Sequence, residues 1–248
     1  ALGANTTASN NTAVGADALL VNTTGHSNTA VGKSALAANT EGFHNVAIGL
    51  SAMDAMTVGD YNTALGGGAL GADTTGAGST AIGYAALTAQ NSTTSADMFN
   101  VAVGREAGAA VTTGVQNTLV GTRSGDAITT GENNTALGYN SLGANTTASN
   151  NVAIGENAMV ANTTGTANVA VGQAALDANT TADNNTAVGY SALTANTTGS
   201  EMVAVGKGAL DANTTGHSNV AIGADALSAN TTANHNTVVG REAMLVNT

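Results

Sequence analysis

The hydrophobic and polar residues of this chain repeat with a fixed period. A run of Asn, Thr or Val, Ala, an aliphatic residue and Gly, such as "NTAVG" at 11–15, returns at 28–32 and then along the whole sequence. The glycine of this run occurs at Gly15, Gly32, Gly49, Gly66, Gly83, Gly104, Gly121, Gly138, Gly155, Gly172, Gly189, Gly206, Gly223 and Gly240. Consecutive glycines of this set are 17 residues apart, except Gly83 and Gly104, which are 21 residues apart. The consensus is N-T-A-V-G-x-x-A-L-x-A-N-T-T-G-x-x, and we number its positions 1 to 17.

A 17-residue unit can form two short helices or one coil of a β-solenoid. Gly and the Asn-Thr runs are unfavourable inside helices. "TAV", "VAI" and "VAV" are instead rich in β-branched residues and alternate with a period of two. The chain has no Pro, which suits coils that all donate N–H groups to a neighbour. The sequence predicts an all-β parallel β-solenoid of about 14 coils, with two short strands per coil and Gly at positions 5 and 15 at the corners.

The repeat predicts one continuous array over residues 1–248, with irregular coils between about 45 and 133. In those coils Met56, Val111 and Ile128 replace the Asn of position 12, and Gly108 and Gly125 replace the Leu of position 9. The segment "QNSTTSADMF" at 90–99 carries four extra residues, which in a solenoid map to a loop on one face. Because the sequence starts without Met and ends inside a repeat, we expect it to be a segment of a longer fibre.

Alternation along a strand assigns the faces of the coil, because successive side chains point to opposite sides. Position 4 is always Val, Ile or Leu, so we expect positions 2 and 4 to point inward together with the Leu or Met of position 9. Position 3 would then face outward, yet it is Ala in 12 of 14 units. An outward row this small and apolar predicts an interface with other copies of the chain, formed by Ala13, Ala30, Ala47, Ala64, Ala81, Ala102, Ala136, Ala153, Ala170, Ala187, Ala204 and Ala221.

The runs "NTAVG", "NVAIG" and "NVAVG" resemble the repeats of trimeric autotransporter adhesin heads of the Yersinia-adhesin type. Strings such as "NTAVGYSALTANTTGS" at 185–200 are also similar to repeat regions of bacteriophage tail fibres. The resemblance covers essentially the whole chain, although adhesin head repeats are typically a few residues shorter. It implies a left-handed β-roll, a homotrimer, and an extracellular, non-catalytic binding fibre on a bacterial cell surface or a virion. The implied partners are copies of the chain itself and a host surface protein, matrix or glycan receptor.

Two rows of Asn recur at positions 1 and 12, and we predict that both are structural. Each amide is expected to hydrogen-bond to its own turn and to the Asn of the next coil. The N-T-T strings are formal glycosylation sequons, which the repetition explains without glycans. The first row is Asn11, Asn28, Asn45, Asn62, Asn100, Asn117, Asn134, Asn151, Asn168, Asn185, Asn219 and Asn236. The second row is Asn22, Asn39, Asn145, Asn162, Asn179, Asn196, Asn213 and Asn230.

Position 6 is chemically mixed and is the candidate for ligand contact. It carries most of the cations and three of the aromatic residues, at Lys33, Tyr84, Arg105, Tyr139, Tyr190, Lys207 and Arg241. The alternative interpretation is a neutral, solvated corner.

Paired Thr residues suggest a different class of function, ice binding by Thr and Asn ladders on a flat β-solenoid. The pairs include Thr23 with Thr24 and Thr163 with Thr164. Adjacent residues on a strand face opposite sides, so only one of each pair could lie in a single plane. Thr that simply flanks turns is the competing interpretation.

Charge and composition exclude several functions. The chain has 16 acidic and 5 basic residues, a net charge of −11, so it offers no basic face for nucleic acid. It has no Cys for a disulfide scaffold or a thiolate metal site, and no apolar run long enough for insertion into a membrane. The four histidines form two pairs, His26 with His44 and His217 with His235. The members of each pair are 18 residues apart, one residue more than the repeat. With no carboxylate at fixed spacing, we expect exposed histidines, no metal site and no cofactor.

No Ser–His–carboxylate set, phosphate loop or pair of acids stands out from the repeat, so we expect no enzyme. The sequence predicts a structural and adhesive role, as the head or shaft of a trimeric adhesin or a phage tail fibre. The alternatives are an ice-binding solenoid and a subunit of a self-assembling extracellular filament.

Overall fold

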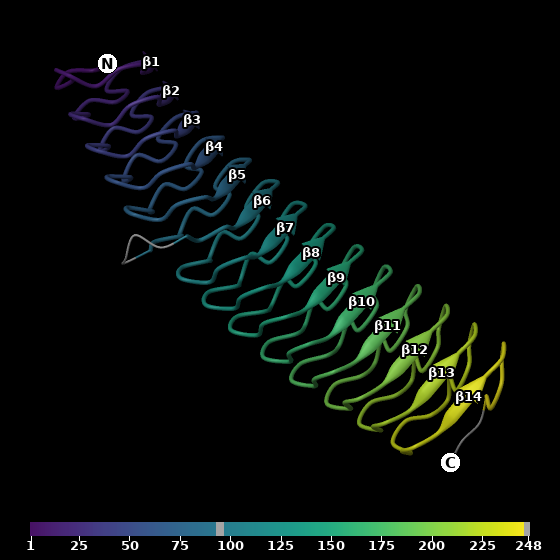
Figure 1. Ribbon diagram of the computed structural model, residues 1–248. Coiled ribbons are helices and arrows are strands. Elements are labelled where there is room, and N and C mark those ends of the chain that lie inside the picture. Colours follow the sequence, from purple (N-terminus) through teal and green to yellow (C-terminus); the bar gives the residue numbers. More distant parts are fainter. Residues whose placement is uncertain (93–96, 246–248) are drawn as a thin grey trace. The chain divides into compact units, whose positions relative to one another are not determined.

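A computed structural model describes residues 1–92 and 97–245 and contains two compact units, Ala1–Thr130 and Gly131–Thr248. The regular elements of the described residues are three-residue β-strands at positions 2 to 4 of each repeat (Figure 1). Those of the first unit are Thr12–Val14 (β1), Thr29–Val31 (β2), Val46–Ile48 (β3), Thr63–Leu65 (β4), Thr80–Ile82 (β5), Val101–Val103 (β6) and Thr118–Val120 (β7). Those of the second are Thr135–Leu137 (β8), Val152–Ile154 (β9), Val169–Val171 (β10), Thr186–Val188 (β11), Val203–Val205 (β12), Val220–Ile222 (β13) and Thr237–Val239 (β14).

Within each unit, consecutive strands pair in parallel, position against position. In the first unit Ala13 pairs with Ala30 and Ala30 with Ala47, and in the second Ala153 pairs with Ala170. The longer interval keeps the same register, because Ala81 pairs with Ala102. The four extra residues therefore do not shift the stacking, although residues 93–96 of the predicted loop lie outside the described residues. The predicted parallel β-solenoid with a 17-residue repeat is confirmed.

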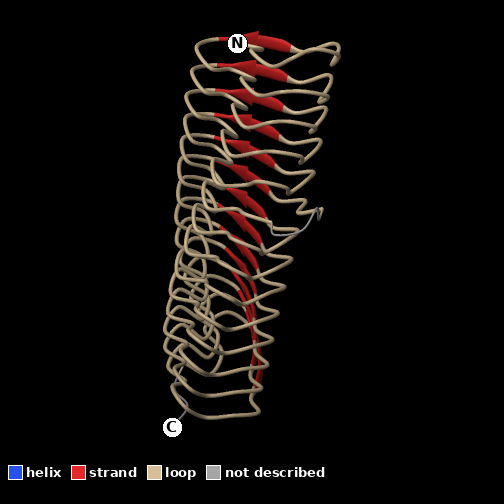
Figure 2. Cartoon of the chain, turned by 90° about the vertical axis from the view of Figure 1, so that its left-hand side faces the viewer, coloured by secondary structure: helices blue, strands red, loops and turns tan. Residues whose placement is uncertain are grey.

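Within residues 1–92 and 97–245, the second predicted strand of each coil is absent. The residues after the strand make turns, so that strands occupy one side of each coil (Figure 2). Positions 7 and 9 have positive φ angles, for example 59° at Ser34 and 50° at Leu36, and an extended strand needs a negative φ. The turns still bond from coil to coil, since the Leu36 N–H donates to the Ala52 carbonyl at 3.0 Å.

The predicted faces of the strand are inverted. Ala30, Ala47 and the other position 3 alanines between 30 and 221 have 0% exposure within the single chain, while Val14 is 57% exposed and Leu65 46%. The alternation was predicted correctly, but positions 2 and 4 point outward and position 3 points inward. The Ala row, except the half-buried Ala13 of the first coil, is thus enclosed by its own chain and offers no surface for a trimer interface.

The inversion follows from how thin the coil is. The Leu of position 9 is buried, as predicted, and opposite it only a small side chain fits. The one coil with Leu at position 3, Leu119, shows this limit. A Cβ placed on Gly108 or Gly125 would lie 2.8 Å from a methyl group of Leu119, so the Leu119 side chain fills the space of two missing leucines. Tight packing admits one large side chain per layer.

Glycine at position 5 has the positive φ expected of a corner, and it also lets neighbouring coils approach. These glycines have φ between 127° and 140°. A Cβ on Gly15, for example, would lie 2.6 Å from the Gly32 carbonyl oxygen of the next coil. Position 15 differs, because none of its described residues has a positive φ and Ala148, Ala182 and Ala233 also occupy it.

Candidate functional site

The outward strand face is uncharged and largely apolar in every coil. Position 2 is Thr or Val, and position 4 is Val, Ile or Leu. Ile48 is 37% exposed, Leu137 47% and Ile222 41%. Parallel pairing in register repeats this surface at every coil, because each strand lies directly beside an equivalent one. We call this surface the sheet face; it is formed by positions 2 and 4 of β1 to β7 in the first unit and of β8 to β14 in the second.

The Asn rows are structural, as predicted. At position 1, the Asn28 Nδ2 donates to the Gly42 carbonyl of its own coil at 2.7 Å, and its Oδ1 accepts from the Asn45 N–H at 2.9 Å. At position 12, the Asn179 Nδ2 donates to the Ala182 carbonyl at 3.1 Å and to the Asn162 Oδ1 at 2.8 Å. Every Asn of position 12 from Asn22 to Asn230 has 0% exposure. Between residues 22 and 230 both Asn rows are fully buried and present no surface to ice, whereas Asn5, Asn11 and Asn236 are half-buried. The N-T-T asparagines from Asn22 to Asn230 are inaccessible in the fold.

The Thr rows also make contacts between coils. At position 13, the Thr163 hydroxyl donates to the Thr180 carbonyl at 3.0 Å, and the Thr197 hydroxyl to the Thr214 carbonyl at 3.1 Å. These hydroxyl hydrogens are committed to the stack of coils. The Thr of position 14, such as Thr164, is exposed, so the two members of a pair lie in different environments, as expected.

The position 6 corner is exposed at all seven predicted ligand contacts, from Lys33 to Arg241. Two of its cations form surface ion pairs: Arg105 lies 3.3 Å from Glu106, and Arg241 lies 2.8 Å from Glu242. Arg123, at position 7, lies 3.0 Å from the second oxygen of Glu106. Exposed pairs of this kind contribute little to stability.

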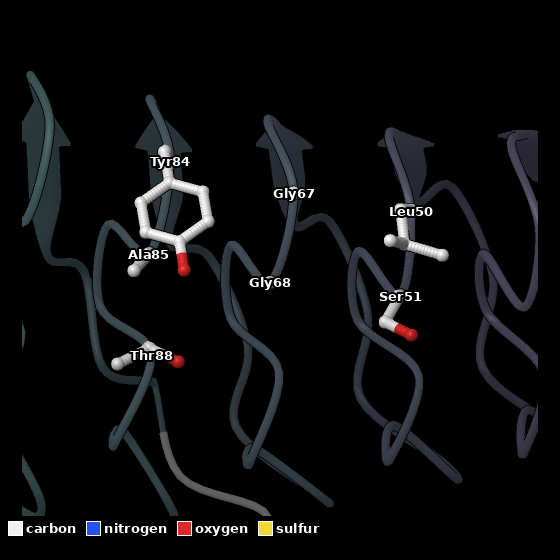
Figure 3. A pocket seen from close by; sticks show the side chains of 7 residues that line it. All are labelled: Leu50, Ser51, Gly67, Gly68, Tyr84, Ala85 and Thr88. Carbon is white, nitrogen blue, oxygen red and sulfur yellow. The ribbon is translucent and has the colours of Figure 1, made fainter.

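One hollow interrupts the position 6 corner in the first unit, and its volume is about 260 Å³. Leu50 and Tyr84 belong to two coils on either side of a third coil. At positions 6 and 7 this third coil has Gly67 and Gly68, which have no side chains (Figure 3). Leu50 is 62% exposed and Tyr84 63%. Ser51, Ala85 and Thr88 complete the lining. Tyr84 was a predicted contact, whereas the rest of the hollow was missed.

The signal for this hollow was present in the sequence. When the units are aligned on their repeat, Gly67 is the one residue of position 6 without a side chain.

An aromatic cluster, missed at the sequence level, lies at positions 16 and 17 of the first unit. His26 stacks on Phe43 with ring centroids 5.1 Å apart, and His44 stacks on Tyr61 at 5.4 Å. Phe43 and Tyr61 meet edge to face at 5.3 Å. The members of each His pair lie close together, with ring centroids 5.5 Å apart for His26 and His44 and 5.4 Å apart for His217 and His235. All four histidines are exposed.

Three aspartates at position 10 have a raised pKa. Burial raises the pKa of Asp177 and Asp211 above the ordinary value of 3.8. Burial also raises the pKa of Asp126, although the nearby Arg123 opposes that shift. None of the three lies in the hollow or the aromatic cluster, so these shifts concern stability.

Within 1–92 and 97–245 no group of three His, Cys, Asp or Glu side chains is placed to hold a metal ion. The same residues contain no helix long and apolar enough to cross a membrane. No protein-family model, no curated protein and no solved structure matches the chain. The fold and its exposed surfaces therefore carry the functional argument.

Proposed function

We propose that this chain is a structural and adhesive segment of an extracellular fibre, in which three copies associate through the sheet face. The observation that supports this function most is the row of Val, Ile and Leu at position 4, which is exposed in six coils and half-buried in the other eight. A soluble monomer seldom exposes an apolar strip of this kind unless a partner covers it. The fibre belongs on a bacterial surface or a virion and performs no catalysis.

A second copy of the chain is the partner that fits the sheet face. The face carries none of the charged residues, so the net charge of −11 does not oppose contact there. Another copy presents the same surface at the same spacing, so contacts repeat coil by coil around a symmetry axis. A three-residue strand is about 10 Å long and coils lie ~4.8 Å apart, so seven coils offer about 340 Å². This is nearly half of the roughly 800 Å² that each partner buries in a specific interface.

Light scattering with size-exclusion chromatography tests the assembly. We expect three times the 23.8 kDa of one chain. The double variant Val171→Lys/Val188→Lys places charges on neighbouring strands of the sheet face and should give monomers, because burying an unpaired charge is costly. The matched control Gln173→Lys/Tyr190→Lys changes position 6 of the same coils and should remain trimeric. A stable wild-type monomer contradicts the proposal.

Two further readouts separate the alternatives. A mass that keeps rising with concentration, with rods visible by electron microscopy, indicates an end-to-end filament. Thermal hysteresis indicates an ice-binding solenoid, and we expect none because the position 13 hydroxyls donate to backbone carbonyls and the Asn rows are buried between residues 22 and 230.

A further inference from the structure

The hollow between Leu50 and Tyr84 is not required by the fold. Gly67 has no positive φ, and a Cβ placed on it would meet no atom closer than 3.6 Å. The other thirteen units carry side chains at this position. Stacking would therefore accept a side chain at Gly67, and its absence creates the open space.

The two ends of the hollow are apolar. The Leu50 side chain forms one end, and the Tyr84 ring forms the other and lies against the bare Gly67 (Figure 3), with its Cδ2 3.6 Å from where a Cβ would be. No aromatic residue of this chain is buried, although aromatic rings usually contribute strongly to cores and interfaces. Tyr84 is thus available to pack against a ligand.

Hydroxyl groups supply the polar part of the lining. Ser51, Thr88 and Tyr84 each have a side-chain hydroxyl, and none of the three makes a side-chain hydrogen bond within the described part of the chain. A hydroxyl both donates and accepts. Apolar walls with a few polar groups are the usual composition of a small-molecule site.

The electrostatics favour an uncharged ligand. No ionisable acid or base lines the hollow, and the nearest cations of the same column, Lys33 and Arg105, belong to the coils beyond its two walls. Arg105 is also paired with Glu106. A phosphate or carboxylate would find no ion pair inside the hollow.

We infer that the hollow formed by Leu50, Ser51, Gly67, Gly68, Tyr84 and Thr88 binds one neutral hexopyranose ring of a glycan. The C–H surface of the sugar packs between Tyr84 and Leu50, and its hydroxyls pair with the hydroxyls of Ser51, Tyr84 and Thr88. The volume of about 260 Å³ lies just below the usual range for drug-sized ligands, about 300–1,000 Å³, and suits a single ring. This inference rests on the adhesive part of the proposed function and names the class of its receptor.

Saturation-transfer NMR with the methyl glycosides of glucose, galactose, mannose and N-acetylglucosamine tests the site. A ligand with about a dozen heavy atoms in an open hollow should bind with a Kd on the order of 1 mM. We expect transfer to at least one glycoside. Gly67→Gln, which fills the hollow, should abolish it, and Tyr84→Ala should weaken binding at least about tenfold.

The matched control variant is Tyr190→Ala, and the mass of the wild-type protein in solution is measured alongside binding. Tyr190 occupies position 6 beside Gln173 and Lys207, so no equivalent glycine opens a hollow there, and Tyr190→Ala should leave binding unchanged. The site is refuted if no glycoside binds the wild type, or if Gly67→Gln binds as well as the wild type. A trimer that binds no glycoside refutes the glycan site alone, whereas a monomer that binds refutes the fibre assembly alone.

Discussion

The coils at 104–130 and those at 145–230 fill the same interior in two different ways. In the second region, position 12 is a buried Asn whose amide bonds to its own turn and to the neighbouring coil. In the first, Val111 and Ile128 replace that Asn, and Leu119 fills the space above Gly108 and Gly125. Hydrogen-bonded Asn and packed apolar side chains both fill the interior, provided that neighbouring coils use the same arrangement.

Where the Asn row of position 12 ends at an apolar residue, a buried side-chain oxygen is left without a hydrogen bond. In the first unit the Asn row meets Met56, whose side chain has no N–H to offer, and the Asn39 Oδ1 is buried without a hydrogen bond. The usual donor to this atom is the side-chain amide of the next coil, as in the bond from Asn39 to Asn22. A buried unpaired acceptor costs about 1–3 kcal/mol. The Asn145 Oδ1 is also buried without a hydrogen bond, although Asn162 follows it in the row. Both unpaired acceptors therefore lie at an end of an Asn row, next to a coil with an apolar residue at position 12.

The largest expected effect comes from breaking a polar row. Asn179→Leu would remove the donor to the Asn162 Oδ1 and the acceptor for the Asn196 Nδ2, and should cost about 4 kcal/mol of unfolding free energy. The matched change Ile128→Leu, at the same position in the hydrocarbon region, should cost less than about 1.5 kcal/mol. Urea denaturation of both variants measures the difference, and equal costs would refute the comparison.

The next effect tests the exchange of volume around Leu119. Gly125→Leu restores the consensus but places its side chain against Leu119 and Ile128, so it should cost about 3 kcal/mol. Leu119→Ala opens a cavity and should cost a similar amount. The double variant should cost about 3 kcal/mol, no more than either single variant, where independent costs would add to about 6 kcal/mol; the coupling energy is then about 3 kcal/mol. Costs that simply add would show that the two side chains do not share one space.

A smaller effect concerns the left-handed residues of position 7. Ala174 has a φ of 55° and Gly68 one of 67°, a conformation that costs a non-Gly residue about 1–2 kcal/mol. Ala174→Gly should stabilise its region by about 1 kcal/mol, and Gly68→Ala, which meets no atom within 4 Å, should destabilise by a similar amount. Shifts of the same sign in both urea midpoints would contradict this account.

The smallest effect is the dependence of stability on pH. Burial raises the pKa of Asp177 and Asp211 in the folded chain, so the folded state holds these protons more tightly than the unfolded state. Their favourable contribution is complete below the unfolded pKa near 3.8 and is lost as the pH rises through the raised pKa. The urea midpoint should therefore rise as the pH falls from 7 towards 4. Asp177→Asn/Asp211→Asn should flatten this rise, and an unchanged profile would contradict the assignment.

The sequence was sufficient to predict the repeat, the parallel stacking and the Asn rows. With a constant spacing, each residue can pair in register only with the equivalent residue of the next coil. It could not decide which strand face points inward, since a period of two fixes the alternation and not its direction. The distance between the two sides of the coil decides which face points inward. In the sequence, this distance is indicated by Leu119, because Gly108 and Gly125 replace the Leu of position 9 beside it. The hollow at Gly67 was missed for a related reason. A glycine is ordinary in a sequence with 32 of them, and only stacking reveals that its neighbours are Leu50 and Tyr84.

Thiol reactivity tests the central claim most directly, because the chain has no Cys and three nearby positions of one coil can be compared. Ala170→Cys should be protected in every folded state, and Gln173→Cys should react freely. Val171→Cys should be protected at concentrations where the trimer forms and become reactive on dilution to monomers. A Val171→Cys thiol that reacts as fast as Gln173→Cys at all concentrations would contradict a sheet face covered by other copies of the chain.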